Sequence, residues 1–512
     1  MANRLIVAVD QGTSSSKGLL LDAQFAELAS VHAPVALQTP AAGWVQQDAT
    51  EIWQSVLRCL NELGDAVSTD AEVAGIALSN QRESAIAWNA KTGEPIGPML
   101  GWQDRRTQSA AAAFDQRDAE RIRAVSGLPL DPMFSALKFA WLLDNTDGAR
   151  AAAESGDVLL GTVDSYLRFK LAGEHVIEIG NASRTQLLDV ATGEWSIELL
   201  ELFNIPMAAL PRVVNSAYLG QPVNSQEITQ ALRGKPIVAV LADSHAALFG
   251  QSLNLEPGAT CVKATLGTGS SIMAVAEQSA LQRATSNGLV STIAWQSPLA
   301  PLVNALEGNI LSSGSTVVWL AESFGRSANE LAEMAEALHT NRASSASAGT
   351  SPQQHVVESE FVNLVPSFGG LGAPWWQSAR GAMIDGMSLA TGLPELALAA
   401  FEAIALQIGD LLDAVDAANE SFAGQVFVDG GPASNDWLLQ LLADLSQRLV
   451  VRSANASLSA VGAAAFGARE HGIWATSAVG ATTRFAPKLP AELAANRIAS
   501  WHAAVHRALS ER

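Results

Sequence analysis

The chain has few cysteines, no long apolar run and fewer basic than acidic residues. Its two cysteines, Cys59 and Cys261, show no metal-ligand spacing, so we expect buried free thiols. No stretch reaches the roughly 18 consecutive apolar residues that a membrane helix needs. With 31 Lys and Arg against 51 Asp and Glu, the formal net charge is −20, which argues against binding to nucleic acids or anionic membranes. The N-terminal residues enter a strand pattern without a basic, apolar leader, and we therefore expect a cytoplasmic protein.

Several familiar catalytic motifs are also absent. The sequence has no Gly-x-x-x-x-Gly-Lys-[Ser/Thr] loop, no His-Glu-x-x-His pair and no Gly-x-Ser-x-Gly elbow. These absences exclude a Walker-type ATPase, a zinc protease of that motif and an α/β-hydrolase. The glycine-rich segment 368–374 ends at Pro374, which blocks the helix start that a dinucleotide-binding motif requires.

The most informative segment, residues 7–17, joins two apolar strand patterns through a polar turn. Asp10 enters this turn, Gly12 lies within it, and the hydroxyl residues Thr13 to Ser16 precede Lys17. Backbone N–H groups and hydroxyls in such a turn form a surface that suits phosphate oxygens. A carboxylate at its mouth suits Mg²⁺. The alternative for this segment alone is an ordinary hairpin with a polar turn.

Two further glycine turns resemble the first. Residues 264–271, about 250 residues downstream, again place Gly, Thr and Ser between two apolar strand patterns. In segment 426–431 an apolar strand ends at two glycines, before a helix that starts near Asn435. Together the three turns predict a nucleotide held between two similar halves.

Short apolar runs alternate with helical periodicity throughout, which predicts an α/β fold in two domains, residues 1–250 and 251–512. The Ser- and Ala-rich segment 341–354 predicts an exposed loop. The main predicted elements are strands at 5–9, 18–22, 27–35, 73–79, 237–241, 260–266 and 272–275, and a helix at 48–67 capped by Asp48.

Polar residues follow the predicted strands where ligands bind in open α/β sheets. Arg82 and Glu83 follow strand 73–79, and together they can hold vicinal hydroxyls. An ordinary pair of opposite charges is the alternative. Trp102 offers an aromatic face beside the polar segment 103–107, as in many sugar or polyol sites, although a core Trp with a solvated charge run fits as well.

Asp243 directly follows strand 237–241 and is the best candidate for a general base. A carboxylate there can accept the proton of a hydroxyl that attacks a γ-phosphate. The alternative is a helix N-cap, a position that Asp also favours. We interpret His245, two residues later, as a residue of the helix start.

In these motifs the chain resembles the FGGY carbohydrate kinase family, and within it the glycerol kinases. The resemblance covers about residues 5–480 and implies two RNase H-like domains of the actin, sugar-kinase and chaperone-ATPase type, with an interdomain cleft that closes on ATP, Mg²⁺ and an alcohol. The landmarks are segments 10–13, 80–83, 102–107, 133–141, 161–164, 181–185, 243–250, 267–269 and 428–431.

The resemblance also implies roles for single residues. Asp10 and Asp243 would organise the metal, and Asp243 would also be the base. Arg82, Glu83, Trp102 and Asp243 match the substrate contacts of glycerol kinases. The residues implied in nucleotide binding are Thr13, Ser14, Ser15, Lys17, Gly267, Thr268, Gly314, Gly431 and Asn435.

The chain departs from glycerol kinases at several of these places. Lys17 stands where glycerol kinases carry an Arg, so the positive charge is kept but the two-pronged hydrogen bonding of a guanidinium is lost. Val318 stands where they commonly carry a Gln that contacts the nucleotide. Met133, Ser244 and Ser271 stand where glycerol kinases carry Tyr, Gln and Phe around the substrate. These three changes predict a larger pocket with different hydrogen bonds, for a longer polyol or sugar such as a tetritol or a pentulose. Neutral drift in a glycerol kinase proper is the alternative.

A regulatory ATP-binding protein of the actin type is the alternative from another class. The polyol-binding residues around Trp102 argue against it, and intact Asp10 and Asp243 argue against a kinase that has lost catalysis. We expect a small-molecule substrate, ATP and Mg²⁺, with neither nucleic acid nor membrane as partner. The sequence leaves a homo-oligomer, either dimer or tetramer, open.

Overall fold

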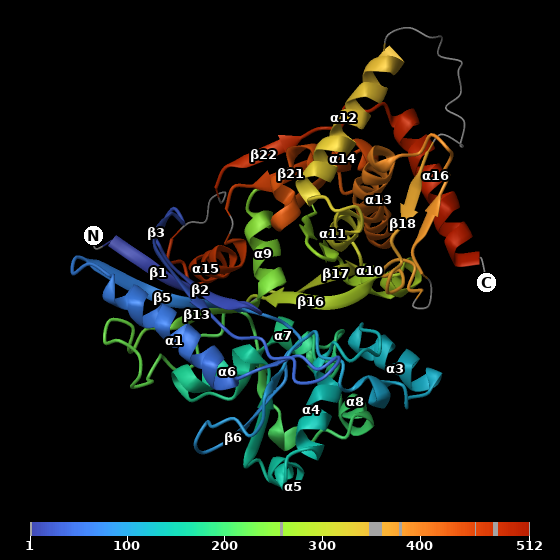
Figure 1. Ribbon diagram of the computed structural model, residues 1–512. Coiled ribbons are helices and arrows are strands. Elements are labelled where there is room, and N and C mark those ends of the chain that lie inside the picture. The colour runs from blue at the N-terminus through green and yellow to red at the C-terminus, as the bar shows by residue number, and fades with distance from the viewer. Residues whose placement is uncertain are drawn as a thin grey trace. The chain divides into compact units, whose positions relative to one another are not determined.

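The computed structural model divides the chain into two compact units, each assembled from separate stretches of sequence (Figure 1). The first unit comprises residues 1–256, 290–305 and 457–479, and the second comprises 257–289, 306–456 and 480–512. The structure describes residues 3–255, 260–298, 300–347, 361–377, 381–455, 457–474 and 480–510. The domain boundary near residue 250 stays a prediction.

The first unit is built on a five-stranded sheet with the strand order β13-β5-β1-β2-β3. The central strands β1, β5 and β13 run parallel, whereas β2 and β3 complete an antiparallel meander beside β1. All five strands lie where the sequence predicts them. Their bounds are β1 (Asn3–Gln11), β2 (Ser15–Leu21), β3 (Glu27–Pro34), β5 (Ala71–Asn80) and β13 (Ile237–Ala242).

Helices pack against this sheet and bury its apolar residues. Helix α1 (Ala49–Asp65) contacts β1, β2 and β3, and helix α15 (Leu458–Glu470) contacts β1, β5 and β13. Because β1 is covered by both helices, its sequence is a continuous apolar run from Leu5 to Val9. The predicted cap of α1 is confirmed, since the Asp48 side chain accepts a hydrogen bond from the Thr50 N–H at 2.7 Å.

The backbones of helices α9 (Asp243–Ser252) and α15 pack directly against each other within the first unit. A Cβ atom added at Gly462 of α15 would lie 1.9 Å from the carbonyl oxygen of Ala246 on α9. A Cβ atom added at Gly250 would lie 3.3 Å from the Gly462 Cα atom. This contact therefore has no room for a side chain at Gly462.

The first unit also contains further strands and helices outside its five-stranded sheet. They are β4 (Gln46–Gln47), β6 (Ile86–Asn89), β7 (Met99–Leu100), α2 (Gln108–Ala111), α3 (Gln116–Ser126), α4 (Ser135–Asp144), α5 (Ala149–Glu154), β8 (Val158–Gly161), α6 (Val163–Ala172), β9 (Val176–Glu178), α7 (Ile179–Ser183), β10 (Leu188–Asp189), β11 (Glu194–Trp195), α8 (Ile197–Leu202), the 3₁₀ turn η1 (Met207–Ala209), β12 (Arg212–Val214) and β16 (Val290–Gln296).

The second unit repeats the strand arrangement of the first. Its strands follow the order β17-β15-β14-β20-β21-β22, in which β14 pairs antiparallel with β15 and parallel with β20. Strand β21 continues the parallel pairing, and β22 runs antiparallel to it. The bounds are β14 (Val262–Leu266), β15 (Ser270–Ala276), β17 (Leu302–Ile310, which starts within the first unit), β20 (Gln425–Asp429), β21 (Leu449–Ser453) and β22 (Thr482–Phe485).

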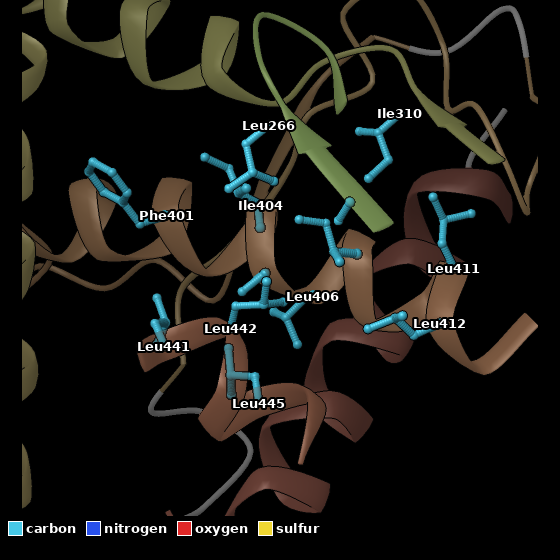
Figure 2. Packing of buried hydrophobic residues seen from close by; sticks show 14 of the residues in the cluster. Leu266, Ile310, Phe401, Ile404, Leu406, Leu411, Leu412, Leu441, Leu442 and Leu445 are labelled. Atoms are coloured by element: carbon cyan, nitrogen blue, oxygen red, sulfur yellow. The ribbon is translucent and has the colours of Figure 1, made fainter. Parts of the chain in front are cut away.

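Helix α13 (Leu393–Asn419) forms the centre of the apolar core of the second unit (Figure 2). Its residues Ile404 and Leu411 belong to the same buried cluster as Leu442 of α14 (Asp436–Ser446) and Leu266 of β14. Apolar side chains lie on most faces of α13, which is the pattern of a helix enclosed in a core. The other elements of this unit are α10 (Gln278–Ala284), η2 (Thr285–Asn287), α11 (Gly314–Ser323), α12 (Ala328–Ser347), β18 (Asn363–Val365), β19 (Met383–Asp385), η4 (Gly431–Ser434) and α16 (Ala491–Ser510).

One prediction about secondary structure is wrong. Residues 341–347 of the predicted loop form the end of α12, because alanine favours a helix; residues 348–354 lie outside the described residues. Both cysteines are buried free thiols, as predicted, and burial raises the pKa of Cys59 to about 11 and of Cys261 to about 12. Among the described residues, no helix has the length and apolar character needed to cross a membrane.

Replacing Gly462 with alanine should destabilise the first unit. The added methyl group meets the Ala246 carbonyl at 1.9 Å, so α9 and α15 must move apart, at a cost of about 1–3 kcal/mol. Thermal or urea unfolding followed by circular dichroism measures the loss. Gly409→Ala in α13 is the control, because nothing lies within 4 Å of an added Cβ there and alanine favours the helix. Equal unfolding midpoints for the two variants would contradict the role of the contact.

Candidate functional site

Two carboxylates lie at the ends of parallel strands in the first unit. Asp10 is near the end of β1, opposite Ser79 on β5, and the Ser79 hydroxyl donates a hydrogen bond to Asp10 Oδ1 at 2.6 Å. Asp243 directly follows β13, and β13 pairs in parallel with β5. Asp243 therefore lies at the same edge of the sheet as Asp10. Burial raises the pKa of Asp10 to about 6, and the negative charge of Asp243 raises it further against the opposing effects of Ser79 and Lys17. The two carboxylates are therefore neighbours that repel each other.

Asp243 lies within α9 and not at its N-cap, which is Ala242, so the N-cap alternative is wrong; its role as a base stays a prediction. It is the first residue of α9, and its Oδ1 atom accepts a hydrogen bond from the Ser244 N–H at 2.5 Å. The same oxygen lies 3.6 Å from Arg82 Nε, and the side chain stays 34% exposed. A helix-terminal carboxylate is thus still accessible to a ligand. His245, by contrast, is fully buried on α9.

Arg82 and Glu83 follow β5 and lie close to Asp243. Arg82 Nε is 3.7 Å from Glu83 Oε1, and both side chains are largely buried. The backbone of Glu83 has a φ of 54°, a left-handed conformation that is uncommon outside glycine and often accompanies functional sites. Arg184, which follows α7, donates from Nε to Glu83 Oε1 at 2.6 Å. Asp10, Arg82, Glu83 and Asp243 are called the strand-end cluster below.

The polar turn between β1 and β2 has the predicted hairpin form. The Gly12 N–H donates to the Ser15 carbonyl at 2.9 Å and closes the turn. The Lys17 ammonium donates to Ser457 Oγ at 2.5 Å, in the segment that precedes α15. Thr13 Oγ1 accepts a hydrogen bond from Trp102 Nε1 at 3.1 Å. The indole of Trp102 therefore lies against the turn that carries the hydroxyls, including exposed Ser14.

Trp102 is a surface residue, and a buried ion pair lies in the segment that follows it. Its side chain is 39% exposed, so it is not the core Trp of the alternative interpretation. The Asp104 carboxylate accepts from Arg106 Nε at 2.9 Å, and both side chains are buried. The Arg106 guanidinium lies over the rings of Trp44 and Trp141, at 4.1 and 4.7 Å from their centroids, and the two rings contact each other edge to face. The alternative of a solvated charge run is therefore wrong for Asp104 and Arg106, because each partner neutralises the other and the two rings cover the guanidinium.

Met133 lies at the start of the segment that leads into α4. Its N–H donates to Asp131 Oδ1 at 2.8 Å, and its half-buried side chain packs against the cluster of Leu128, Phe134 and Val290. A flexible thioether in this position presents an apolar surface without a hydrogen-bonding hydroxyl.

The second unit contains a corresponding turn between β14 and β15. The Gly314 N–H donates to the Gly267 carbonyl at 3.0 Å, and the N–H groups of Ser313 and Ser315 both donate to the Thr268 carbonyl at 3.0 Å. A Cβ atom at Gly314 would lie 2.5 Å from the Gly267 oxygen, so the close approach of α11 to the turn requires glycine. The predicted residues Gly267, Thr268 and Gly314 thus lie together.

The turn after β20 lies against the same part of the second unit. Gly430 has a φ of +93°, and a Cβ atom there would lie 2.0 Å from the Leu266 carbonyl oxygen, whereas nothing lies within 4 Å of a Cβ at Gly431. Asn435 caps α14, since its Oδ1 accepts from the Leu438 N–H at 3.1 Å. Gly431 therefore presents open backbone, which suits a ligand that approaches closely.

Two other predicted positions of the second unit lie on regular elements. Ser271 is on β15 opposite Thr265. Val318 is on α11 and is 49% exposed. An exposed valine offers a nucleotide only van der Waals contact.

The donor set of the first unit fits a magnesium ion that also binds phosphate. In the described part of the chain no three His, Cys, Asp or Glu residues form a metal cluster. Mg²⁺ commonly uses one or two carboxylates and takes its other ligands from waters and substrate phosphates. The mutually repelling carboxylates Asp10 and Asp243 supply that number. The glycine turns of both units likewise fit phosphate oxygens, because backbone N–H groups and hydroxyls in such turns bind anions.

Sequence reasoning missed three side chains that support these residues. Arg184 and Lys138 lie in recognised segments, but no spacing rule indicates that Arg184 binds Glu83 or that the Lys138 ammonium contacts the Glu83 carbonyl. Ser457 lies 440 positions from Lys17 and carries no motif.

Comparisons with known proteins agree with the fold. Residues 5–250 match the N-terminal domain of the FGGY family of carbohydrate kinases, and residues 262–471 match the C-terminal domain of that family. A glycerol kinase from Geobacter sp. (strain M21) is 38% identical, with 98% of each chain covered, and one from Burkholderia cenocepacia is 35% identical, with 99% of this chain and 98% of the relative covered.

Solved structures show the same architecture. The crystal structure of Plasmodium falciparum glycerol kinase with ADP superposes with a TM-score of 0.88 at 25% identity and covers 100% of this chain and 99% of its own. A xylulose kinase from Lactobacillus acidophilus superposes with a TM-score of 0.82 at 20% identity, covering 99% and 98%, and supports the fold alone. The predicted two-domain sugar-kinase fold is confirmed, and the chain belongs to the FGGY family of carbohydrate kinases.

Proposed function

We propose that this chain transfers the γ-phosphoryl group of ATP to a terminal hydroxyl of a small polyol or sugar, in a pocket that differs from that of glycerol kinases. The observation that carries the proposal is the strand-end cluster, in which the Asp243 carboxylate lies 3.6 Å from Arg82 at the edge where the hydroxyl-rich turn begins. A carboxylate base, a guanidinium and a phosphate-type turn are the groups that alcohol phosphorylation requires.

The alcohol is proposed to bind through Arg82, Glu83 and the exposed face of Trp102. Arg82 donates hydrogen bonds to hydroxyl oxygens, whereas Glu83 accepts them from hydroxyl protons. Arg184 binds Glu83 Oε1 at 2.6 Å and so fixes the carboxylate before the alcohol arrives. The Trp102 indole supplies an apolar surface for the carbon chain.

Asp243 is proposed as the general base. Its carboxylate orients the terminal hydroxyl and accepts the proton as the oxygen attacks the γ-phosphorus. The Ser244 N–H donates to Asp243 Oδ1 at 2.5 Å, and Arg82 Nε lies 3.6 Å from the same atom, so these two groups orient the carboxylate.

In the first unit, we propose that the nucleotide phosphates bind the turn from Thr13 to Ser15 and the ammonium of Lys17. In the second unit, the turn at Gly267 and Thr268, together with Gly314, is proposed for phosphate, and Gly431 with Asn435 for the adenosine. ADP in the related P. falciparum enzyme supports an adenine nucleotide. Asp10 and Asp243 would hold Mg²⁺, which neutralises charge on the transferred phosphoryl group.

The choice of alcohol is proposed to depend on Met133, Ser244 and Ser271. Met133 offers a thioether where glycerol kinases have a phenol, and its side chain also packs against Phe134. The two serines are smaller than the Gln and Phe that they replace. A longer substrate fits these changes, because lost bulk makes room and lost hydrogen bonds weaken the binding of glycerol.

A substrate screen tests the proposed function. Purified protein with ATP and Mg²⁺ should release ADP when a polyol or sugar is added, and more strongly with a tetritol, pentitol or pentulose than with glycerol. The screen compares glycerol, erythritol, threitol, ribitol, xylitol and common pentuloses. A response to glycerol alone would mean that the chain is a glycerol kinase proper, and ADP release that no alcohol stimulates would favour an actin-like ATP-binding protein.

Asp243→Asn should lower kcat by about 10²–10⁴-fold, because the amide keeps the shape but cannot accept the proton. Nucleotide binding, measured by titration calorimetry with ADP in the absence of metal, should change little. Asp189→Asn serves as the matched control and should retain wild-type kcat, because Asp189 is a half-buried residue at the end of β10 whose Oδ1 accepts a hydrogen bond from the Ala191 N–H, which an asparagine oxygen also accepts. A kcat near the wild-type value in Asp243→Asn would show that another group is the base.

Lys17→Met should raise the KM for ATP by about tenfold, because the turn loses its cation beside the phosphates. The KM for the alcohol should change by less. Initial rates at saturating alcohol measure the effect, and Lys91→Met is the control, since Lys91 is an exposed surface residue paired only across the surface with Asp157. The assignment of Lys17 is wrong if both variants keep the ATP KM of the wild type.

A further inference from the structure

Lys138 has a buried ammonium group that contacts the backbone of the strand-end cluster at Glu83. It lies on α4 and its side chain is fully buried. The Nζ atom donates to the carbonyl oxygens of Glu83 at 2.5 Å, Met133 at 2.7 Å and Gly101 at 2.8 Å. An ammonium group has three N–H donors, so each of the three carbonyls can receive one.

The three carbonyls belong to the three segments that carry the proposed alcohol-binding residues. Two of them are the carbonyls of Glu83 and Met133 themselves, and the third belongs to Gly101, the residue before Trp102. Glu83 also has the left-handed φ of 54°, a conformation that persists only when its surroundings hold it. One charged group thus binds the backbone of all three segments.

We propose that Lys138 is a positioning residue that aligns Glu83, Trp102 and Met133 for the alcohol, and that it does so only as an ammonium. The inference rests on the proposed function, because it concerns the binding of the same alcohol. A neutral amine has two donors and a lone pair, so one carbonyl would lose its partner and face that lone pair. The segment concerned would then shift, and a misplacement of about 1 Å can cost about 10²-fold in rate.

The charge of Lys138 is sensitive to pH near neutrality. Burial lowers the pKa of Lys138 to about 7; the carboxylates of Glu83, Asp104 and Asp131 act in the opposite direction, and the Arg105 guanidinium lowers it further. Lys138 is charged below this pKa and neutral above it. The KM for the alcohol should therefore be constant at lower pH and rise as the pH increases through and beyond about 7.

A purely structural lysine predicts a different result. Its removal would lower the stability of the protein, but the folded molecules would bind the alcohol as before. Leu142→Ala provides that comparison, because Leu142 is fully buried on the same helix, belongs to the apolar cluster of Leu160 and Phe203, and has no polar side-chain atom that could bond to a carbonyl. This control should lower the thermal midpoint and leave the alcohol KM unchanged.

The first experiment measures steady-state kinetics of Lys138→Met with the best alcohol of the screen. We expect the alcohol KM to rise by about tenfold or more, with the KM for ATP within about twofold of the wild type. An unchanged alcohol KM in the folded variant would overturn the inference. A wild-type protein that phosphorylates no alcohol would overturn the proposed function instead, so the two failures are distinguishable.

The second experiment stands even when Lys138→Met does not fold. The alcohol KM of the wild type and of Lys138→Arg is measured from about pH 6 to 9. We expect the wild-type KM to rise with pH and the Lys138→Arg profile to be flat, because a guanidinium stays protonated throughout. A flat wild-type profile, or an equal rise in Lys138→Arg, would overturn the inference.

Discussion

The parallel pairing of β1, β5 and β13 determines where the candidate catalytic groups of the first unit lie. In this register Asp10 is opposite Ser79, and Ala242, the last residue of β13, is opposite Asn80. The residues that follow β5 and β13 therefore emerge at the edge where Asp10 lies. A slip of one residue in β1 would turn its side chains to the opposite face, so this pairing constrains the chemistry as well as the fold.

The site concentrates cations locally in a chain with a formal net charge of −20. Arg184 and Lys138 are fully buried, and each contacts Glu83, one through the side chain and the other through the carbonyl. Charged groups at such depth are costly unless they are paired, and both have close acceptors. The positive charge at this site thus comes from a few fixed groups, although the chain as a whole is acidic.

Much of this arrangement follows from sequence patterns, and the exceptions have physical reasons. The positions of Asp10 and Asp243 were predictable because each residue comes after the apolar run of a strand, and the carboxyl ends of these parallel strands lie at one edge of the sheet. The burial of Arg106 was not predictable, since the two tryptophans that cover it come from distant segments. Lys138 lies on an apolar helix, where periodicity indicates burial but not which carbonyls the ammonium meets. The end of α12 was missed because serine-rich composition was given more weight than the helix propensity of alanine.

The return of the chain to the first unit has a consequence for its biosynthesis. The segment 457–479 supplies α15, which covers β1, β5 and β13, and Ser457, which binds Lys17. A nascent chain on the ribosome carries the N-terminal strands long before these residues are translated. The apolar faces of β5 and α9 must then wait for α15, although domains generally fold as units during synthesis. The first unit therefore cannot complete the packing of its central sheet until residues 457–479 have been synthesised.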